Sequence, residues 1–271
     1  MKKPSANNIA NFISNINYAI LKIIGKNLPK HVALNIIQKE NNYFLHEKNL
    51  ILQTDLLKLC HLIFDESSLK TEMKLSDNFS KRIRHAFVFQ LAMNAIKKDK
   101  GKSSIAECGC FKGQSSYIIS KAIMLNGHNN TFHIFDSFEG LSDYSKHDIT
   151  NLSEEKIQET RKVFAASIDL VKDNLKDFNF IQYHKGWIPS RFNEVEGQKF
   201  CFVNIDVDLH DPIKDSLEFF YPRLVSGGSI FLDDYGFNQF PGASTAIDDF
   251  IKINKPSYFL ALPTGGAFLI K

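Results

Sequence analysis

The sequence has 271 residues, of which 44% are hydrophobic and 23% are charged. This composition is ordinary for a soluble globular protein, and the length allows one large domain with a full core. The net charge of +3 is too small to indicate a nucleic-acid-binding protein. No apolar run reaches the about 18 residues of a membrane-spanning helix, so no transmembrane segment is predicted. The four cysteines are typical of reduced core thiols in a cytoplasmic protein.

The first 80 residues predict helices without strands. Residues 9–24 place isoleucine and phenylalanine side chains on one helical face. Another helix is expected over residues 47–64, and the polar residues 65–80 form the expected junction. We therefore expect a helical N-terminal extension, residues 1–80, that acts as a lid or joins copies of the chain into a homo-oligomer. The main domain is expected over residues 81–271. A contact of the first helix with a membrane surface is the alternative.

The main domain opens with a strand, a loop that contains glycines, and a helix. A short apolar run leads into the motif E-C-G-C-F-K-G, which holds Glu107, Gly109 and Gly113. The helix follows from Gln114 to Leu125, and its first turn includes Ser115. The glycines let the backbone turn tightly and approach a ligand, and the helix N-terminus offers free N–H donors. The alternative is a simple tight turn, because the spacing is not that of the dinucleotide fingerprint.

Two further strands end in candidate ligand-binding residues. Residues 131–135 predict a strand that is followed by Asp136, and an acidic residue at this place is the usual partner of ribose hydroxyls in nucleoside-binding α/β folds. The alternative is that Asp136 caps a turn. Residues 178–184 predict a third strand, and Trp187 follows it. This indole ring is a candidate for stacking on a base or substrate, and a core position is the alternative.

The chain continues with two strands that flank one crossover helix. Residues 200–205 and 229–232 are short runs rich in β-branched and aromatic residues, as in buried parallel strands. Residues 212–224 between them carry apolar side chains at helical spacing, and two glycines are expected to end this helix. The two strands should therefore be parallel neighbours. Residues 258–262 and 267–270 predict a closing hairpin.

Three carboxylates follow these two strands directly. Asp206 ends the first strand, and Asp233 and Asp234 end the second. Because parallel neighbours end at the same edge of a sheet, the three side chains should meet where open α/β folds bind ligands. Ligand sets made only of oxygen suit Mg²⁺ better than zinc. The alternative is that these acids are solvated or cap helices, as Asp208 or Asp211 could for the following helix.

Five segments, spread over residues 105–236, resemble the macrocin O-methyltransferase family, the metal-dependent natural-product sugar methyltransferases. They are AECGCFKGQSS, FDSFEGL, KGW, NIDVDLHDP and GGSIFLDDYG. The resemblance implies an α/β, Rossmann-like class I methyltransferase fold. Its sheet is seven-stranded and mostly parallel, in the order 3-2-1-4-5-7-6, with an antiparallel C-terminal hairpin. S-adenosylmethionine and Mg²⁺ are the implied cofactors.

The resemblance also implies roles for individual residues. In the family pattern the methionine part of S-adenosylmethionine contacts the loop after the first strand. The ribose contacts the acidic residue after the second strand. The implied cofactor-binding residues are Glu107, Gly109, Gly113, Ser115, Asp136, Ser137 and Trp187. The implied metal ligands are Asp206, Asp233 and Asp234. Asp206 is in addition the implied catalytic base.

The sequence therefore predicts transfer of a methyl group to a hydroxyl of a small molecule, a sugar or a glycosylated natural product. Val207 and His210 depart from the family, which has Gly and Tyr there, and His210 is a candidate for altering the acceptor pocket. The alternatives are a metal-independent methyltransferase of the same fold, a nucleotide-dependent oxidoreductase and a non-catalytic nucleoside-binding protein. The oxidoreductase should show the tighter glycine fingerprint, which the sequence lacks.

Overall fold

The computed structural model describes residues 55–73, 79–148 and 153–271. Contacts divide the chain into two units, Met1–Leu57 and Lys58–Lys271, and the second carries the fold described below. The helix expected over residues 9–24, with its role as lid or oligomer contact, lies outside the described residues. Within the described residues, no helix is long and apolar enough to cross a bilayer.

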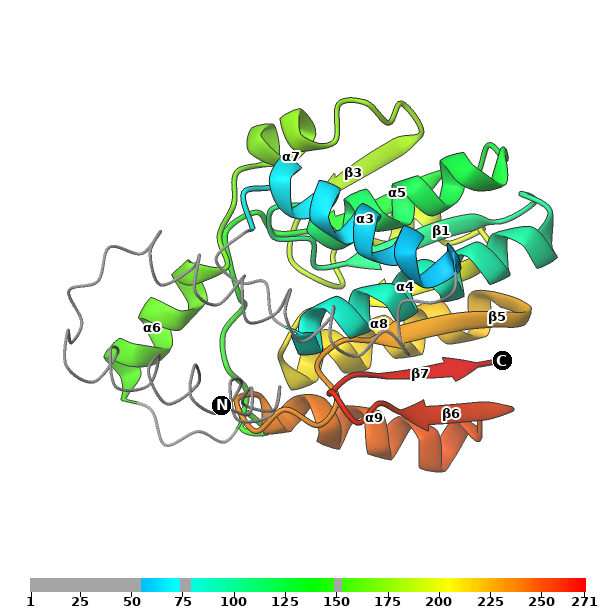
Figure 1. Ribbon diagram of the computed structural model, residues 1–271. Coiled ribbons are helices and arrows are strands. Elements are labelled where there is room, and N and C mark those ends of the chain that lie inside the picture. Colours follow the sequence, from blue (N-terminus) through cyan, green and yellow to red (C-terminus); the bar gives the residue numbers. More distant parts are fainter. Residues whose placement is uncertain (1–54, 74–78, 149–152) are drawn as a thin grey trace, which may run out of the picture. The chain divides into compact units, whose positions relative to one another are not determined.

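The described part of the second unit contains a seven-stranded sheet with the strand order β3-β2-β1-β4-β5-β7-β6 (Figure 1). The strands are β1 (Ser104–Cys108), β2 (Phe132–Asp136), β3 (Ile181–Lys185), β4 (Phe200–Ile205), β5 (Leu224–Leu232), β6 (Tyr258–Ala261) and β7 (Ala267–Ile270). Strands β1 to β5 pair in parallel, whereas β7 is antiparallel to both β5 and β6. The predicted strand order and the closing hairpin are confirmed.

Helices cover both faces of the sheet because neighbouring residues of each buried strand point to opposite sides. The helices are α3 (Asp55–Lys70), α4 (Phe79–Asp99), α5 (Gln114–Asn126), α6 (Glu154–Val163), α7 (Ile168–Asn174), α8 (His210–Arg223) and α9 (Pro241–Asn254). In β4, Phe202 belongs to the apolar cluster that includes α3, α4 and α5, and its neighbour Val203 belongs to the cluster that includes α8 and α9. Two cores, one on each face, therefore hold the sheet in place.

The compact unit begins earlier in the chain than the boundary expected at residue 80. Helix α3 contributes Cys60, Ile63 and Phe64 to the same buried cluster as α4 and α5. It runs on to Lys70, through part of the polar stretch that was expected to be a junction. The polar residues lie on both faces of α3, because Asp65 and Lys70 are exposed whereas Ser67 and Ser68 are buried, with Ser67 Oγ donating to Phe64 O.

Two element boundaries differ from expectation. The helix α8 ends at Arg223, and the two glycines expected to end it lie inside β5. They belong to the strand because Gly227 N–H donates to Lys271 O and Lys271 N–H donates to Gly228 O, which extends the sheet. Strand β3 starts at Ile181 rather than at residue 178.

Candidate active site

A cavity of about 450 Å³ lies at the carboxyl edge of the sheet. Its wall includes five of the seven residues predicted to bind the cofactor: Gly109, Ser115, Asp136, Ser137 and Trp187. The wall also includes Asp206, Asp233 and Asp234, which follow β4 and β5. The volume lies in the range of small-molecule and cofactor sites. The two predicted half-sites therefore share one cavity.

Asp136 holds together the loops on the side of the cavity that the predicted cofactor-binding residues line, which we call the cofactor side. Its Oδ2 accepts hydrogen bonds from the backbone N–H groups of Cys110, at 2.8 Å, and Phe111, at 3.3 Å. Its Oδ1 accepts from Phe138 N–H at 2.6 Å. A carboxylate has about four acceptor positions, so one is still open to a ligand hydroxyl. Phe111 and Phe138 have φ values of 49° and 58°, a left-handed conformation that costs energy and is common at functional sites.

Gly109 joins the cofactor side to the carboxylate side. Its φ is +79°, and a Cβ added to it would lie 1.8 Å from the backbone oxygen of Asp206. Asp206 N–H in turn donates to Cys108 O at 2.9 Å. Only glycine allows this approach, which brings the loop after β1 against the end of β4.

Glu107 and Gly113 do not line the cavity. Glu107 is fully buried between β1, β4 and α5, where it accepts hydrogen bonds from Ser116 Oγ and, at 2.8 Å, from Asn204 Nδ2. Burial raises the pKa of Glu107 to about 7, although the hydrogen bonds from its neighbours oppose this. Gly113, with a φ of +88°, precedes α5 and packs against Leu175. A role of either residue in binding the cofactor stays a prediction.

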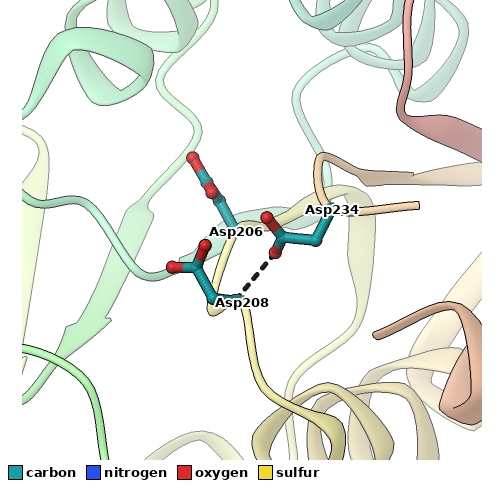
Figure 2. Close-up of side chains that lie close together, drawn as sticks. All are labelled: Asp206, Asp208 and Asp234. Atoms are coloured by element: carbon teal, nitrogen blue, oxygen red, sulfur yellow. Dashed lines mark hydrogen bonds between the residues drawn. The ribbon is translucent and has the colours of Figure 1, made fainter. Parts of the chain in front are cut away.

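Three carboxylates converge at the other side of the cavity (Figure 2). One oxygen each from Asp206, Asp208 and Asp234 lies within 4.8 Å of the others. Asp208 N–H donates to Asp234 Oδ2 at 2.7 Å, and Asp208 has a φ of 60°. This bent backbone turns the Asp208 side chain back toward the ends of β4 and β5, instead of leaving it to cap α8.

The ionised cluster destabilises the folded protein unless a positive charge offsets the repulsion between its carboxylates. Burial, followed by repulsion from neighbouring carboxylates, raises the pKa of Asp206, Asp208 and Asp234 well above the ordinary value. Three converging acids, of which Asp208 and Asp234 are buried and Asp206 is half-buried, offer only oxygen donors and are the type of set that binds Mg²⁺ or a similar hard cation. The residues present therefore fit a divalent metal ion.

One member of the predicted metal set, Asp233, lines the cavity but is not part of the converging group. Asp233 Oδ1 accepts a hydrogen bond from Arg84 Nε on α4 at 2.9 Å, in an ion pair whose side chains are only 14% and 11% exposed. The Arg84 guanidinium also donates to Ser80 Oγ and lies 4.8 Å from the centre of the Phe237 ring. The acids that converge are therefore Asp206, Asp208 and Asp234, because Arg84 engages Asp233.

The sequence interpretation missed several residues of this cavity. Asp208 was weighed only as a cap, although it stands in the same D-V-D motif as Asp206. Lys81, Arg84 and His85 on α4 also line the cavity. Nothing in the sequence marked them, since Arg84 and its partner Asp233 are 149 positions apart.

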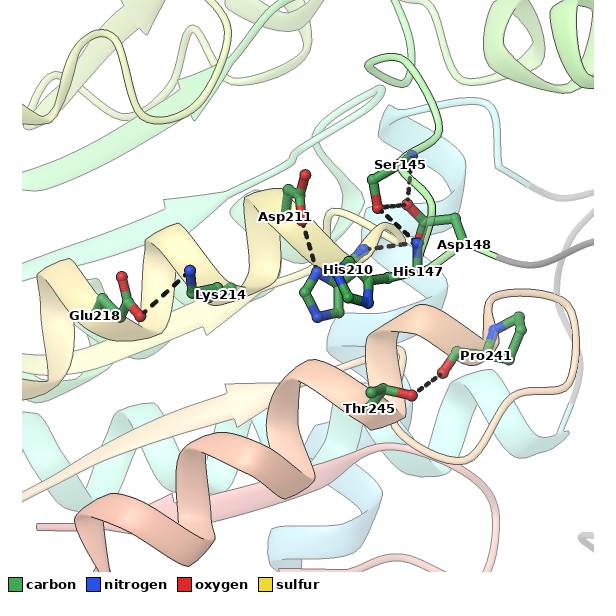
Figure 3. Close-up of polar contacts among 9 residues, drawn as sticks. All are labelled: Ser145, His147, Asp148, His210, Asp211, Lys214, Glu218, Pro241 and Thr245. Atoms are coloured by element: carbon green, nitrogen blue, oxygen red, sulfur yellow. Dashed lines mark hydrogen bonds and ion pairs between the residues drawn. The ribbon is translucent and has the colours of Figure 1, made fainter.

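His210 does not line the cavity, and its suggested effect on the acceptor pocket stays a prediction. Its ring stacks on His147 at 4.1 Å, and its Nδ1 lies 2.6 Å from Asp211 Oδ1 (Figure 3). Its backbone N–H donates to Asp148 Oδ1 at 2.8 Å. These contacts fasten the loop after β2 to the start of α8.

Known proteins resemble the chain in both sequence and fold. The family described as Macrocin-O-methyltransferase (TylF) matches residues 80–258. An 8-demethyl-8-(2,3-dimethoxy-alpha-L-rhamnosyl)-tetracenomycin-C 4'-O-methyltransferase from Streptomyces olivaceus is 25% identical over 55% of this chain and 59% of its own length. A demethyldecarbamoylnovobiocin O-methyltransferase from Streptomyces niveus is 23% identical over 54% of this chain and 57% of its own length. The chain thus spans less than two thirds of each of these relatives.

Solved structures show the same fold. The O-methyltransferase NovP superposes with a TM-score of 0.58 at 18% identity, covering 69% of this chain and 79% of NovP. An O-methyltransferase from Bacillus cereus, solved in complex with SAH, gives a TM-score of 0.51 at 13% identity. The superposition covers 88% of this chain and 100% of the Bacillus cereus chain. The fold is that of the Rossmann-like class I methyltransferases. Since the family match extends over most of the described sheet, this chain belongs to the macrocin-O-methyltransferase family.

Proposed function

We propose that the protein is an S-adenosylmethionine- and Mg²⁺-dependent O-methyltransferase that acts on a hydroxyl of a small molecule. One observation carries the proposal: five of the seven predicted cofactor residues and a cluster of three carboxylates line the same cavity. Family membership supports a methyltransferase over a nucleotide-dependent oxidoreductase. We also propose that the protein is cytoplasmic and that its acceptor is a small molecule.

The cofactor side of the cavity fits S-adenosylmethionine. Asp136 lies where ribose hydroxyls bind in related folds, and Ser115 lies in the first turn of α5, whose N–H groups suit a carboxylate. Trp187, which is 40% exposed at the rim, offers a flat face to the adenine base. The bound cofactor supplies an activated methyl group on a sulfonium sulfur.

The carboxylate side of the cavity prepares the acceptor. Asp206, Asp208 and Asp234 would hold the metal ion, which when bound lowers the pKa of an acceptor hydroxyl and fixes its position. A carboxylate oxygen of Asp206 then takes the hydroxyl proton. With the cofactor bound, the acceptor oxygen would bond to the methyl carbon as the carbon–sulfur bond broke and left its electron pair on sulfur. Orientation of the acceptor within the cavity supplies much of the rate.

The proposed acceptor is a sugar or a glycosylated natural product with two neighbouring oxygens. Three carboxylates leave about three of the six positions of Mg²⁺ for water or substrate, so a vicinal diol could bind through both oxygens. One relative is named for a rhamnosyl-bearing substrate, which supports a sugar hydroxyl.

Three measurements test the proposed function. Calorimetry should show binding of S-adenosylhomocysteine but not of NAD. Mass spectrometry with isotope-labelled S-adenosylmethionine should show label transfer to diol-containing sugars, and a chelator should abolish the transfer until Mg²⁺ or Mn²⁺ is restored. Binding of NAD alone would overturn the assignment, and full transfer in chelator would leave a metal-independent methyltransferase.

A further inference from the structure

His85 on α4 is a buried histidine in the cavity wall that the proposed chemistry does not use. It is 5% exposed and lines the cavity beside Lys81 and Arg84. Its Nδ1 lies 2.9 Å from Lys81 O. Because a carbonyl oxygen can only accept, Nδ1 carries the proton and Nε2 keeps a free lone pair in the neutral ring.

The neutral form of His85 is the stable one. Burial, aided by the charge of Lys81, lowers the pKa of His85 to about 3. Among the described residues no side chain or backbone group donates to Nε2. Nε2 is also absent from the set of fully buried side-chain atoms that lack a hydrogen-bond partner. The cavity wall therefore presents an unpartnered hydrogen-bond acceptor to whatever ligand occupies it.

The position of His85 indicates which part of a ligand it meets. Its ring packs edge-on against Phe64 of α3, with ring centres 5.5 Å apart. Gln114, the first residue of α5, donates from Nε2 to Ser68 Oγ of α3 at 2.7 Å. Phe64 and Ser68 are one helical turn apart and so lie side by side on α3. His85 is therefore close to the first turn of α5.

This corner of the cavity offers both halves of a site for an amino-acid group. The N-terminus of α5 presents backbone N–H donors, which suit a carboxylate. The His85 Nε2 presents an acceptor, which suits an ammonium group. A neutral acceptor adds no positive charge near a sulfonium ion and no further negative charge near the three acids.

We propose that His85 Nε2 accepts a hydrogen bond from the α-ammonium group of the methionine part of the cofactor. This inference rests on the proposed function, because it assumes that S-adenosylmethionine occupies the cavity. His85 thereby distinguishes ligands with an amino-acid tail from simple adenosine thioethers. The segment that positions it includes α3, which lies before the residues 80–258 that match the family.

Two substitutions separate the roles of the two ring nitrogens. His85→Asn keeps a donor near the Nδ1 position for Lys81 O but removes the Nε2 acceptor. His85→Gln places an amide oxygen near the Nε2 position. Calorimetry compares S-adenosylhomocysteine with 5′-methylthioadenosine, which has the same adenosine and thioether but no amino-acid tail. His85→Asn should weaken binding of S-adenosylhomocysteine about 5- to 30-fold, the effect of an ammonium left without its acceptor.

The His85→Gln variant and the second ligand distinguish recognition of the ammonium group from a structural role of His85. His85→Gln should recover most of the affinity, and 5′-methylthioadenosine should bind all three proteins within about twofold, since it makes no contact with Nε2. Equal losses for both ligands would mean that His85 only supports the fold, and an unchanged affinity for S-adenosylhomocysteine would also overturn the proposal. Both results would leave the proposed function intact, because the wild type still binds the cofactor product.

A wild-type measurement keeps the inference testable if a variant fails to fold. The deaminated analogue of S-adenosylhomocysteine should bind the wild type about 5- to 30-fold more weakly than the parent compound. Equal affinity would show that no group of the protein recognises the ammonium, which overturns the inference. Failure of the wild type to bind S-adenosylhomocysteine at all would instead overturn the proposed function itself.

Discussion

Glu107 retains its proton near neutral pH because burial raises its pKa from the ordinary 4.5 to about 7. Between these two values the folded chain binds the proton more tightly than the unfolded chain. The contribution of Glu107 to stability is therefore fully present below about pH 4.5 and is lost as the pH rises through about 7.

Glu107→Gln should remove this pH dependence. The amide can still accept from Asn204 and donate to Ser116, so the network keeps its shape. We expect the variant to be more stable than the wild type by about 1–3 kcal/mol at pH 8 and nearly equal at pH 4.5. Urea unfolding at both pH values measures the difference. The exposed Glu139→Gln is the control, and an equal effect of both substitutions would contradict the argument.

Asp136→Ala should weaken binding of S-adenosylhomocysteine by about 1–3 kcal/mol. The reason is twofold: a ribose acceptor is lost, and the N–H groups of Cys110, Phe111 and Phe138 lose their shared partner. Calorimetry measures the loss, and thermal unfolding checks the fold. An unchanged affinity would remove Asp136 from the cofactor site.

Asp208→Asn should weaken binding of Mn²⁺, used as a probe for the metal, more than Asp233→Asn does. Asp208 is a member of the converging cluster, whereas Asp233 is engaged by Arg84. We expect the Asp208 variant to lose at least about tenfold in affinity, since one of three charged ligands becomes neutral. Electron paramagnetic resonance of free Mn²⁺ follows the titration. The reverse order of effects would show that Asp233 leaves Arg84 when metal binds, as the family resemblance implies.

At the scale of elements, α8 is capped by a residue from a distant loop. Its N-cap residue is Leu209, which has no side-chain hydrogen bond to offer. Asp148 supplies the missing acceptor to His210 N–H, and its other oxygen accepts from Ser145 N–H at 2.9 Å (Figure 3). The carboxylate also lies against Gly242 near the start of α9, where an added Cβ would approach it to 2.3 Å.

Asp148→Ala should therefore destabilise the protein by about 2 kcal/mol, the upper range for loss of a helix cap. The buried N–H of His210 would be left without a partner. Asp148→Asn retains an acceptor oxygen and should cost less than half as much. Urea unfolding at neutral pH compares the three proteins, and equal stability of the alanine variant would show that water replaces the cap.

At the scale of the whole molecule, the boundary of the compact unit can be tested by truncation. Removal of residues 1–57 should leave a cooperatively folding chain, because Lys58–Lys271 forms a compact unit. Removal of residues 1–80 should abolish folding or cost several kcal/mol. Burial of Ile63 and of Phe64 contributes about 1.5–3 kcal/mol each. Circular dichroism during thermal unfolding distinguishes the two chains, and equal unfolding temperatures would restore the boundary at residue 80.

The residue pattern was sufficient to predict the edge at which the ligand-binding residues gather, whereas the order of the strands followed from the family resemblance. Buried strands have a recognisable local composition, and parallel strands must end at one edge, so Asp136, Asp206 and Asp234 could be placed without coordinates. The motif around Gly109 was readable for the same reason, because tight approach of two loops requires a residue without Cβ.

Which side chains face the cavity depends on long-range packing and could not be read from the sequence. The direction of Asp208 depends on one backbone angle, and the partner of Asp233 comes from a helix 149 positions earlier in the chain. The burial of Glu107 and the free nitrogen of His85 likewise depend on how α3, α4 and α5 pack on the sheet. Local sequence patterns record the period of an element but not the long-range contacts that turn a side chain toward a ligand or away from it.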